Sequence, residues 1–115
     1  MNDKKVDISV RGKTEIERLI LILNIGLMTA MEEGTIEPDE TEYCLYSPYS
    51  LEVLKEKGVR KEIVDLIHKG LFIDDTKRLC NDKSAYLKTV CEIKNEALRL
   101  LSTLPKVGEY SHWLL

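Results

Sequence analysis

The feature that most constrains the fold is one long apolar segment, residues 16–31, with helix signals on both sides. Thr14 and Glu17 have the spacing of a capping box, in which each side chain satisfies an amide of the first helical turn. Gly34 follows at the place where helices commonly end. The continuous apolar part, residues 19–31, is shorter than the 18 or so residues that cross a membrane. We therefore predict a buried helix and no membrane span.

The predicted helix is apolar on two sides, and both sides need cover. One broad stripe is expected to face the core. A second stripe, made of Leu21, Ile25 and Met28, lies roughly opposite. Either other helices of the same chain bury this second stripe, or it forms the interface of a homodimer. The broad stripe contains Ile16, Leu19, Ile20, Leu23, Leu27, Ala30 and Met31.

Proline and glycine delimit the next two helices. Pro38 suits the first turn of a short helix that continues to residue 45 or 46. Ser47 and Pro48 then repeat the start signal, with serine as the N-cap, and this helix is expected to stop at Gly58.

Three further helical segments follow. Residues 60–69 form a helix that ends at Gly70, and one turn is expected within residues 74–79. The last long helix starts at residue 81 or 82 and continues to residue 104, before a proline. Its core stripe contains Tyr86, Val90, Ile93, Ala97, Leu100, Leu101 and Leu104.

The two ends of the chain are less regular. Val6, Ile8 and Val10 alternate with polar residues, as in a half-buried strand. A single strand is not stable alone, so residues 1–12 either pair with residues 71–73, pair with a second copy, or form an ordered arm. Residues 106–115 form a tail whose aromatic residue either docks or is mobile.

Composition agrees with one helical domain. The chain is 43% hydrophobic and 32% charged, which is usual for a globular protein, and its 6% aromatic content is low for a β-sandwich. No repeat or low-complexity stretch divides the 115 residues. We predict a single all-α domain, residues 1–115, built as a compact bundle of five or six helices around the central apolar helix.

The cysteines indicate the compartment. Cys44, Cys80 and Cys91 are odd in number and lack CxxC spacing, so they favour a reducing environment over a disulfide scaffold. The polar N-terminus lacks the apolar run of a signal peptide. We expect a cytoplasmic protein in which these cysteines are small buried side chains.

No pattern in the sequence predicts catalysis. The cysteines, His68 and His112 never fall at metal-ligand spacings, and phosphate-binding and nucleophile motifs are missing. An enzyme would have to use His68 or a cysteine such as Cys80, without a motif to place them together. We predict no catalytic residues, no metal and no cofactor.

A helix-turn-helix over residues 47–69 is the alternative hypothesis, since it would make the protein a small DNA-binding regulator. The net charge of −3 argues against nucleic acid. Carboxylates also alternate with the cations of this segment, as on a solvated helix surface. The cations are Lys55, Lys57, Arg60, Lys61 and Lys69, and the carboxylates are Glu52, Glu56, Glu62 and Asp65.

The acidic block between residues 32 and 42 is the best candidate for a binding surface. It holds six carboxylates and no cation, and tyrosines follow directly. Carboxylates steer a basic partner, and tyrosines anchor protein interfaces. A solvated loop would account for the same charges, but the combination favours a protein partner. The predicted partner-binding residues are Glu37, Asp39, Glu40, Glu42, Tyr43, Tyr46 and Tyr49.

The central stretch, residues 36–75, carries three short motifs: Leu-Tyr-Ser-Pro-Tyr at 45–49, Leu-Lys-Glu-Lys-Gly-Val at 54–59, and Ile-His-Lys-Gly at 67–70. With its helical flanks it resembles a family of short, functionally uncharacterised bacterial proteins. The resemblance implies an immunity-type role, in which the protein binds and neutralises a toxin encoded nearby, and it brings no catalytic residues. We therefore expect a non-enzymatic interaction module, immunity or antitoxin-like.

Overall fold

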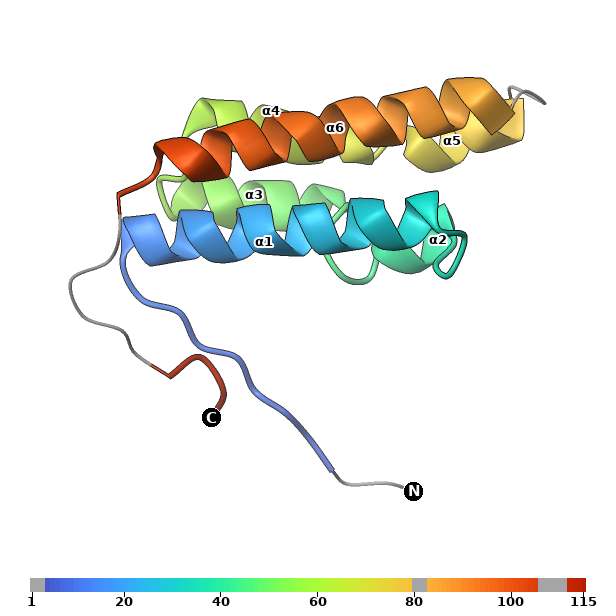
Figure 1. The fold of residues 1–115 in the computed structure, drawn as a ribbon. Helices are drawn as coiled ribbons and strands as arrows, with labels where there is room; N and C mark the ends of the chain where they lie inside the picture. The colour runs from blue at the N-terminus through green and yellow to red at the C-terminus, as the bar shows by residue number, and fades with distance from the viewer. Residues whose placement is uncertain (1–3, 80–82, 106–111) are drawn as a thin grey trace.

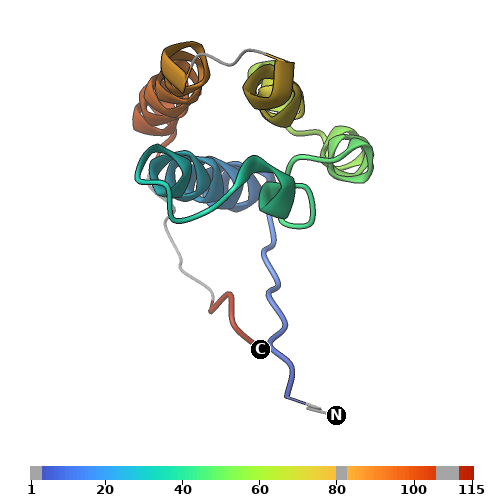
Figure 2. The ribbon, with the colours of Figure 1, turned by 90° about the vertical axis from the view of Figure 1, so that its right-hand side faces the viewer.

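The computed structural model describes residues 4–79, 83–105 and 112–115, and it confirms the all-α bundle (Figure 1). Helix α6 lies antiparallel along α1, and α4 and α5 pack against α6 (Figures 1 and 2). Within these ranges, no helix is long and apolar enough to cross a membrane. The helices are α1 (Lys13–Glu32), α2 (Pro38–Thr41), α3 (Pro48–Glu56), α4 (Lys61–Gly70), α5 (Ile73–Leu79) and α6 (Lys83–Thr103).

The second stripe of α1 is buried within the monomer, which is one of the two alternatives that the sequence left open. Leu21 and Met28, from the predicted second stripe, are completely buried in the monomer, and Ile25 packs against the same core. A homodimer interface through these residues is therefore wrong. In the predicted core stripe, Leu23 is exposed to 39%, and Met31 alone is fully buried. One face of α1 is therefore buried in the core, and the opposite face is partly exposed to solvent.

Polar residues hide the buried stripe of α1 in the sequence. Apart from Glu15, the buried positions on α1 recur at intervals of four and three residues, which is the spacing of a helix–helix seam. Two of them, Glu17 and Asn24, are polar, so counting apolar residues alone hides the seam. It contains Glu17, Leu21, Asn24, Met28 and Met31.

Helix α6 supplies the facing seam, and here the sequence prediction is confirmed. Its buried residues also recur at intervals of four and three, and Leu101 and Leu104 lie partly buried beside them. Two such seams facing each other make the long interface between α1 and α6. The buried residues of α6 are Tyr86, Val90, Ile93, Ala97 and Leu100.

Glycines end α1 and α3 as expected. Gly34 and Gly58 each have φ near 74°, the left-handed conformation that glycine adopts without strain. After each, the next amide bonds back to the last turn: Thr35 N to Ala30 O at 3.0 Å, and Val59 N to Leu54 O at 3.1 Å. Both ends are therefore Schellman motifs.

The predicted capping box at the start of α1 is wrong. The helix begins one residue after Gly12, whose φ is 89°, and its N-cap has no side-chain hydrogen bond. Glu17 instead turns inward, where it is 3% exposed. Its Oε2 accepts a hydrogen bond from the backbone N–H of Arg60 at 2.8 Å, and its Oε1 lies 3.6 Å from Arg60 Nε. Glu17 thus ties α1 to the residue that precedes α4.

The N-terminal arm and the C-terminal residues contact each other outside the bundle. Residues 4–12 lead away from the helices as an extended arm, and residues 112–115 return beside it (Figures 1 and 2). Ile8 and Leu114 form one isolated antiparallel bridge. Pairing of the arm with residues 71–73 is wrong, because Leu71 and Phe72 connect α4 to α5. The remainder of the predicted tail, residues 106–111, lies outside the described residues.

Gly70 is used for close packing, not for a left-handed turn. It belongs to α4, and a Cβ built on it would lie 2.3 Å from Cδ1 of the Tyr46 ring. That ring is buried. A methyl group at residue 70 therefore has no space unless the ring moves.

We predict opposite effects for two glycine-to-alanine changes. Gly70→Ala forces the Tyr46 ring aside and should lower the free energy of unfolding by about 1–3 kcal/mol. Gly26→Ala is the matched control, because no atom lies within 4 Å of its Cβ and it sits inside α1. It should raise stability by about 0.5–1 kcal/mol. Urea unfolding followed by circular dichroism measures both, and equal effects would contradict the packing role.

Candidate protein-interaction site

The connection between α2 and α3 is a compact turn that separates exposed from buried side chains. The carbonyl of Thr41 accepts backbone hydrogen bonds from Cys44, Leu45 and Tyr46, at 3.0–3.1 Å. Leu45 and Tyr46 then enter the core, with 3% and 1% exposure. Because Leu45 and Tyr46 anchor the turn in the core, Tyr43 lies on the side of the turn that faces solvent.

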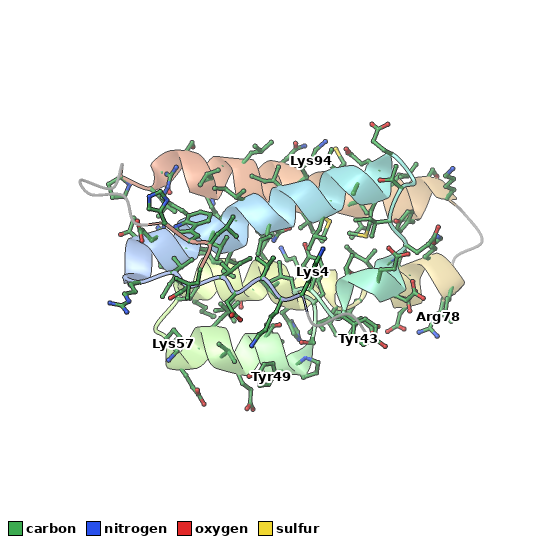
Figure 3. All side chains as sticks on the ribbon, turned by 90° about the horizontal axis from the view of Figure 1, so that it is seen from below. Lys4, Tyr43, Tyr49, Lys57, Arg78 and Lys94 are labelled. Atoms are coloured by element: carbon green, nitrogen blue, oxygen red, sulfur yellow. The ribbon has the colours of Figure 1, made fainter. Side chains whose placement is uncertain are left out.

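Two tyrosines of the predicted site are strongly exposed. Tyr43 is 94% exposed and Tyr49 is 79% exposed. Figure 3 shows Tyr49 on the outer edge of α3 and Tyr43 beside α2. Tyr49 lies in the first turn of α3. Ser47 caps this turn, because the Ser47 Oγ accepts a hydrogen bond from the backbone N–H of Ser50 at 3.1 Å. The predicted serine cap is confirmed.

Tyr46 does not belong to the surface, contrary to the prediction. Its hydroxyl donates a hydrogen bond to Oδ1 of Asn24 at 2.8 Å, between two buried side chains. Burial raises the pKa of the Tyr46 phenol far above its ordinary value. The physical reason is the spacing along the turn: Tyr46 follows Leu45 into the core, whereas Tyr43 and Tyr49 lie three residues away on either side.

Two carboxylates of the acidic block have cationic partners from distant helices. Glu32 binds Lys94 of α6 at 2.5 Å. Glu37 pairs with Lys77 of α5, and this hydrogen bond is the main cause that raises the pKa of Lys77. The block is therefore less negative than its sequence suggests. Sequence reasoning could not find these pairs, because 62 and 40 residues separate the partners.

Three carboxylates remain open beside the exposed tyrosines. Asp39, Glu40 and Glu42 are exposed, and no ion pair is formed by them within the described residues. Two cations act on this surface at longer range. Lys77, which pairs with Glu37, is also attracted by Asp39, and Arg78, which binds Asp75 at 2.7 Å and Asp74 at 3.3 Å, is also attracted by Glu42. We name this surface the acid–tyrosine patch: Asp39, Glu40, Glu42, Tyr43 and Tyr49.

Helices α3 and α4 contact each other, and their exposed surface carries both signs of charge. The apolar residues of α4 face the core, and Lys61, Glu62, Asp65 and Lys69 are exposed. Glu62 also lies 3.8 Å from Arg99 of α6. No observation here favours DNA over protein, so the regulator hypothesis stays a prediction.

Of the residues considered for chemistry, His68, Cys44 and Cys91 lie within the described parts of the chain. His68 is exposed and packs edge-on against Phe72, with ring centroids 5.3 Å apart. Cys44 is exposed and Cys91 half-buried, so the expectation of buried thiols is wrong for Cys44. Cys80 lies outside the described residues. Among the residues that are described, no group of three histidine, cysteine or acidic side chains could hold a metal ion.

We predict that Tyr46→Phe lowers the free energy of unfolding by about 1–3 kcal/mol, because Asn24 would keep a buried oxygen without a donor. The Nδ2 of Asn24 already lacks a partner among the described residues. Tyr43→Phe is the matched control, since its hydroxyl is in water, and it should change stability by less than about 0.5 kcal/mol. Chemical unfolding measures both, and equal losses would show that the buried hydrogen bond has no net effect.

The same residue predicts a pH dependence. Tyr46 must be protonated in the folded core, and its raised pKa means that stability from this group is complete below the unfolded pKa of about 10. Above that pH, the free energy of unfolding of the wild type should fall by about 1.4 kcal/mol per pH unit more than that of Tyr46→Phe. Unfolding curves between pH 9 and about pH 11.5 test this, and parallel pH profiles would contradict it.

Comparison with known proteins identifies the family of the chain. No curated protein and no solved structure matches the chain. One family model covers residues 11–115, which includes every helix of the bundle. The chain therefore belongs to the family described as "Protein of unknown function (DUF3969)".

Proposed function

We propose that this protein is a non-enzymatic interaction module that binds a basic protein partner through the acid–tyrosine patch. The observation that carries the proposal is the exposure of Tyr43 and Tyr49, at 94% and 79%, beside three open carboxylates. Tyrosines are enriched among the anchor residues of interfaces, because they bury a large area at low entropic cost. Open carboxylates accelerate the approach of a basic partner and suppress acidic ones.

The way the patch is held supports this function. Its turn is anchored by Leu45 and Tyr46, and the Tyr46 hydroxyl is bonded to α1. Ser47 fixes the first turn of α3, which carries Tyr49. A surface that is ordered before binding loses less conformational entropy when the partner arrives. These anchors leave the tyrosine side chains free for a partner while their backbone stays in place.

The more specific proposal is an immunity or antitoxin-like role in the bacterial cytoplasm. An acidic surface suits this role because it can mask the basic surface of a toxin. Both the motifs at residues 45–49, 54–59 and 67–70 and the free thiols of Cys44 and Cys91 are in keeping with it. The partner is expected to be encoded next to this protein.

We predict that reversing the patch charges abolishes partner binding. Capture of partners from the source organism by the tagged full chain comes first, and calorimetry then gives the Kd. The triple change Asp39→Lys, Glu40→Lys and Glu42→Lys should weaken binding about a hundredfold or more, and Tyr43→Ala should weaken it about tenfold or more. Rising salt should slow association with the wild type.

A matched control uses carboxylates of the same charge elsewhere. The triple change Glu62→Lys, Asp65→Lys and Glu92→Lys alters three exposed positions of α4 and α6, outside the patch, and should leave the Kd within about threefold of wild type. Equal binding by the patch variant and the wild type would overturn the proposal. Equal weakening by the control and the patch variant would reduce it to a general effect of net charge.

A further inference from the structure

The arm and the C-terminal residues form a two-stranded ribbon outside the bundle. Ser9 N–H donates to Trp113 O at 2.8 Å, and Leu115 N–H donates to Asp7 O at 2.9 Å. These bonds flank the Ile8–Leu114 bridge, so the two side chains stand opposite each other on one face. A two-stranded ribbon is marginal in water without additional strands or a packed face.

One face of this ribbon is apolar and open to solvent. Side chains alternate along the arm, which puts Val6 and Ile8 on the face of Leu114. Their exposed fractions are 72%, 58% and 67%. The arm leads away from the helices, so the bundle of the same molecule does not cover this face (Figures 1 and 2).

The outer edge of the arm is also unpaired. Backbone groups of Asp7 and Ser9 point to the C-terminal segment, and those of Val6, Ile8 and Val10 point the opposite way. No backbone partner is recorded for these three residues among the described parts of the chain. Such an edge is a template for another strand.

Charge identifies a second copy of the same arm as the fitting occupant. An antiparallel pair of arms related by a two-fold axis at Ser9 puts Asp7 opposite Arg11 of the other copy, twice. It also puts Ile8 opposite Val10, and these are the residues whose backbone groups point outward. An axis at Ile8 would oppose Lys5 and Arg11, and an axis at Asp7 would oppose two aspartates. An axis at Val6 would oppose Lys5 and Asp7, but it would overlap only residues 4–8 of the arm. The Ser9 register opposes unlike charges and also pairs Ile8 with Val10.

We propose that the protein forms a homodimer in which residues 6–12 of two copies pair antiparallel about Ser9. The two ribbons then join into one four-stranded sheet, with the C-terminal segments at its outer edges. Val6 and Ile8 of both copies gather on one face, and the row of unpaired backbone groups is satisfied. The dimer thereby closes with two-fold symmetry, since the same edge serves both molecules.

The arrangement keeps the two bundles apart. Each arm ends at Gly12, where α1 begins, so the partner's bundle lies at the opposite end of the paired strands, roughly 20 Å further along. This interface is separate from Asp39–Tyr49 of the patch, and it goes beyond the proposed function. A dimer would carry two patches and could engage two partner molecules.

We predict a concentration-dependent dimer that responds to charge swaps. Sedimentation equilibrium of the full chain should show the dimer, and Asp7→Arg or Arg11→Asp alone should raise its Kd about tenfold to a hundredfold. The double variant Asp7→Arg/Arg11→Asp should restore it. Mixing the two single variants should also give a heterodimer, because each supplies the charges that the other lacks. Val10→Pro removes an outward N–H and should prevent pairing.

Controls keep the result specific to this edge. Lys4→Glu changes an exposed charge outside the paired residues 6–12, and it should shift the Kd less than about threefold. Circular dichroism should show the helical bundle unchanged in every variant. The proposal is overturned if the wild type stays monomeric up to about 500 μM, which is far above the Kd of specific complexes. The unpaired edge of the arm would then bind something other than a second copy. A dimer that is indifferent to all three swaps and to Val10→Pro would overturn it as well.

Discussion

The buried hydrogen bond between Tyr46 and Asn24 is the contact on which the arrangement of the other elements depends. The phenol comes from the turn between α2 and α3, its hydroxyl meets Asn24 of α1, and its ring fills the space that Gly70 of α4 leaves. One side chain therefore positions three parts of the chain. It also sets where the turn enters the core, and hence which residues of that turn face solvent.

Local signals predicted most of the elements, but not the orientation of α1. Proline, serine and glycine marked the starts and ends of α3 and α4 within a residue or two, because caps are decided by neighbours in sequence. The seam of α6 was also predicted, since all its members are apolar. On α1 the seam includes Glu17 and Asn24, and their partners Arg60 and Tyr46 are distant in sequence. No periodicity of hydrophobic residues reveals such a seam.

The candidate site shows the same limit. Tyr43, Tyr46 and Tyr49 look equivalent in the sequence, and only the turn that buries Leu45 separates the middle one from the other two. Likewise, the acidic block lacks cations within itself but receives two lysines from α5 and α6. What sequence could predict was the composition of the surface. Which of these tyrosines and carboxylates remain exposed and without an ion pair depends on tertiary contacts.

Polar residues in the seam have a further consequence. An apolar seam would let α1 slide or rotate against its neighbours at little cost, whereas Glu17 and the Oδ1 of Asn24 keep their hydrogen bonds in one register only. Glu17 orients α1 against the start of α4, and Asn24 orients it against the turn that precedes α3. The exposed tyrosines are carried by that same turn and by α3. Their placement on the surface is thus determined by hydrogen bonds buried beneath them, and loosening those bonds should disorder the patch before it unfolds the bundle.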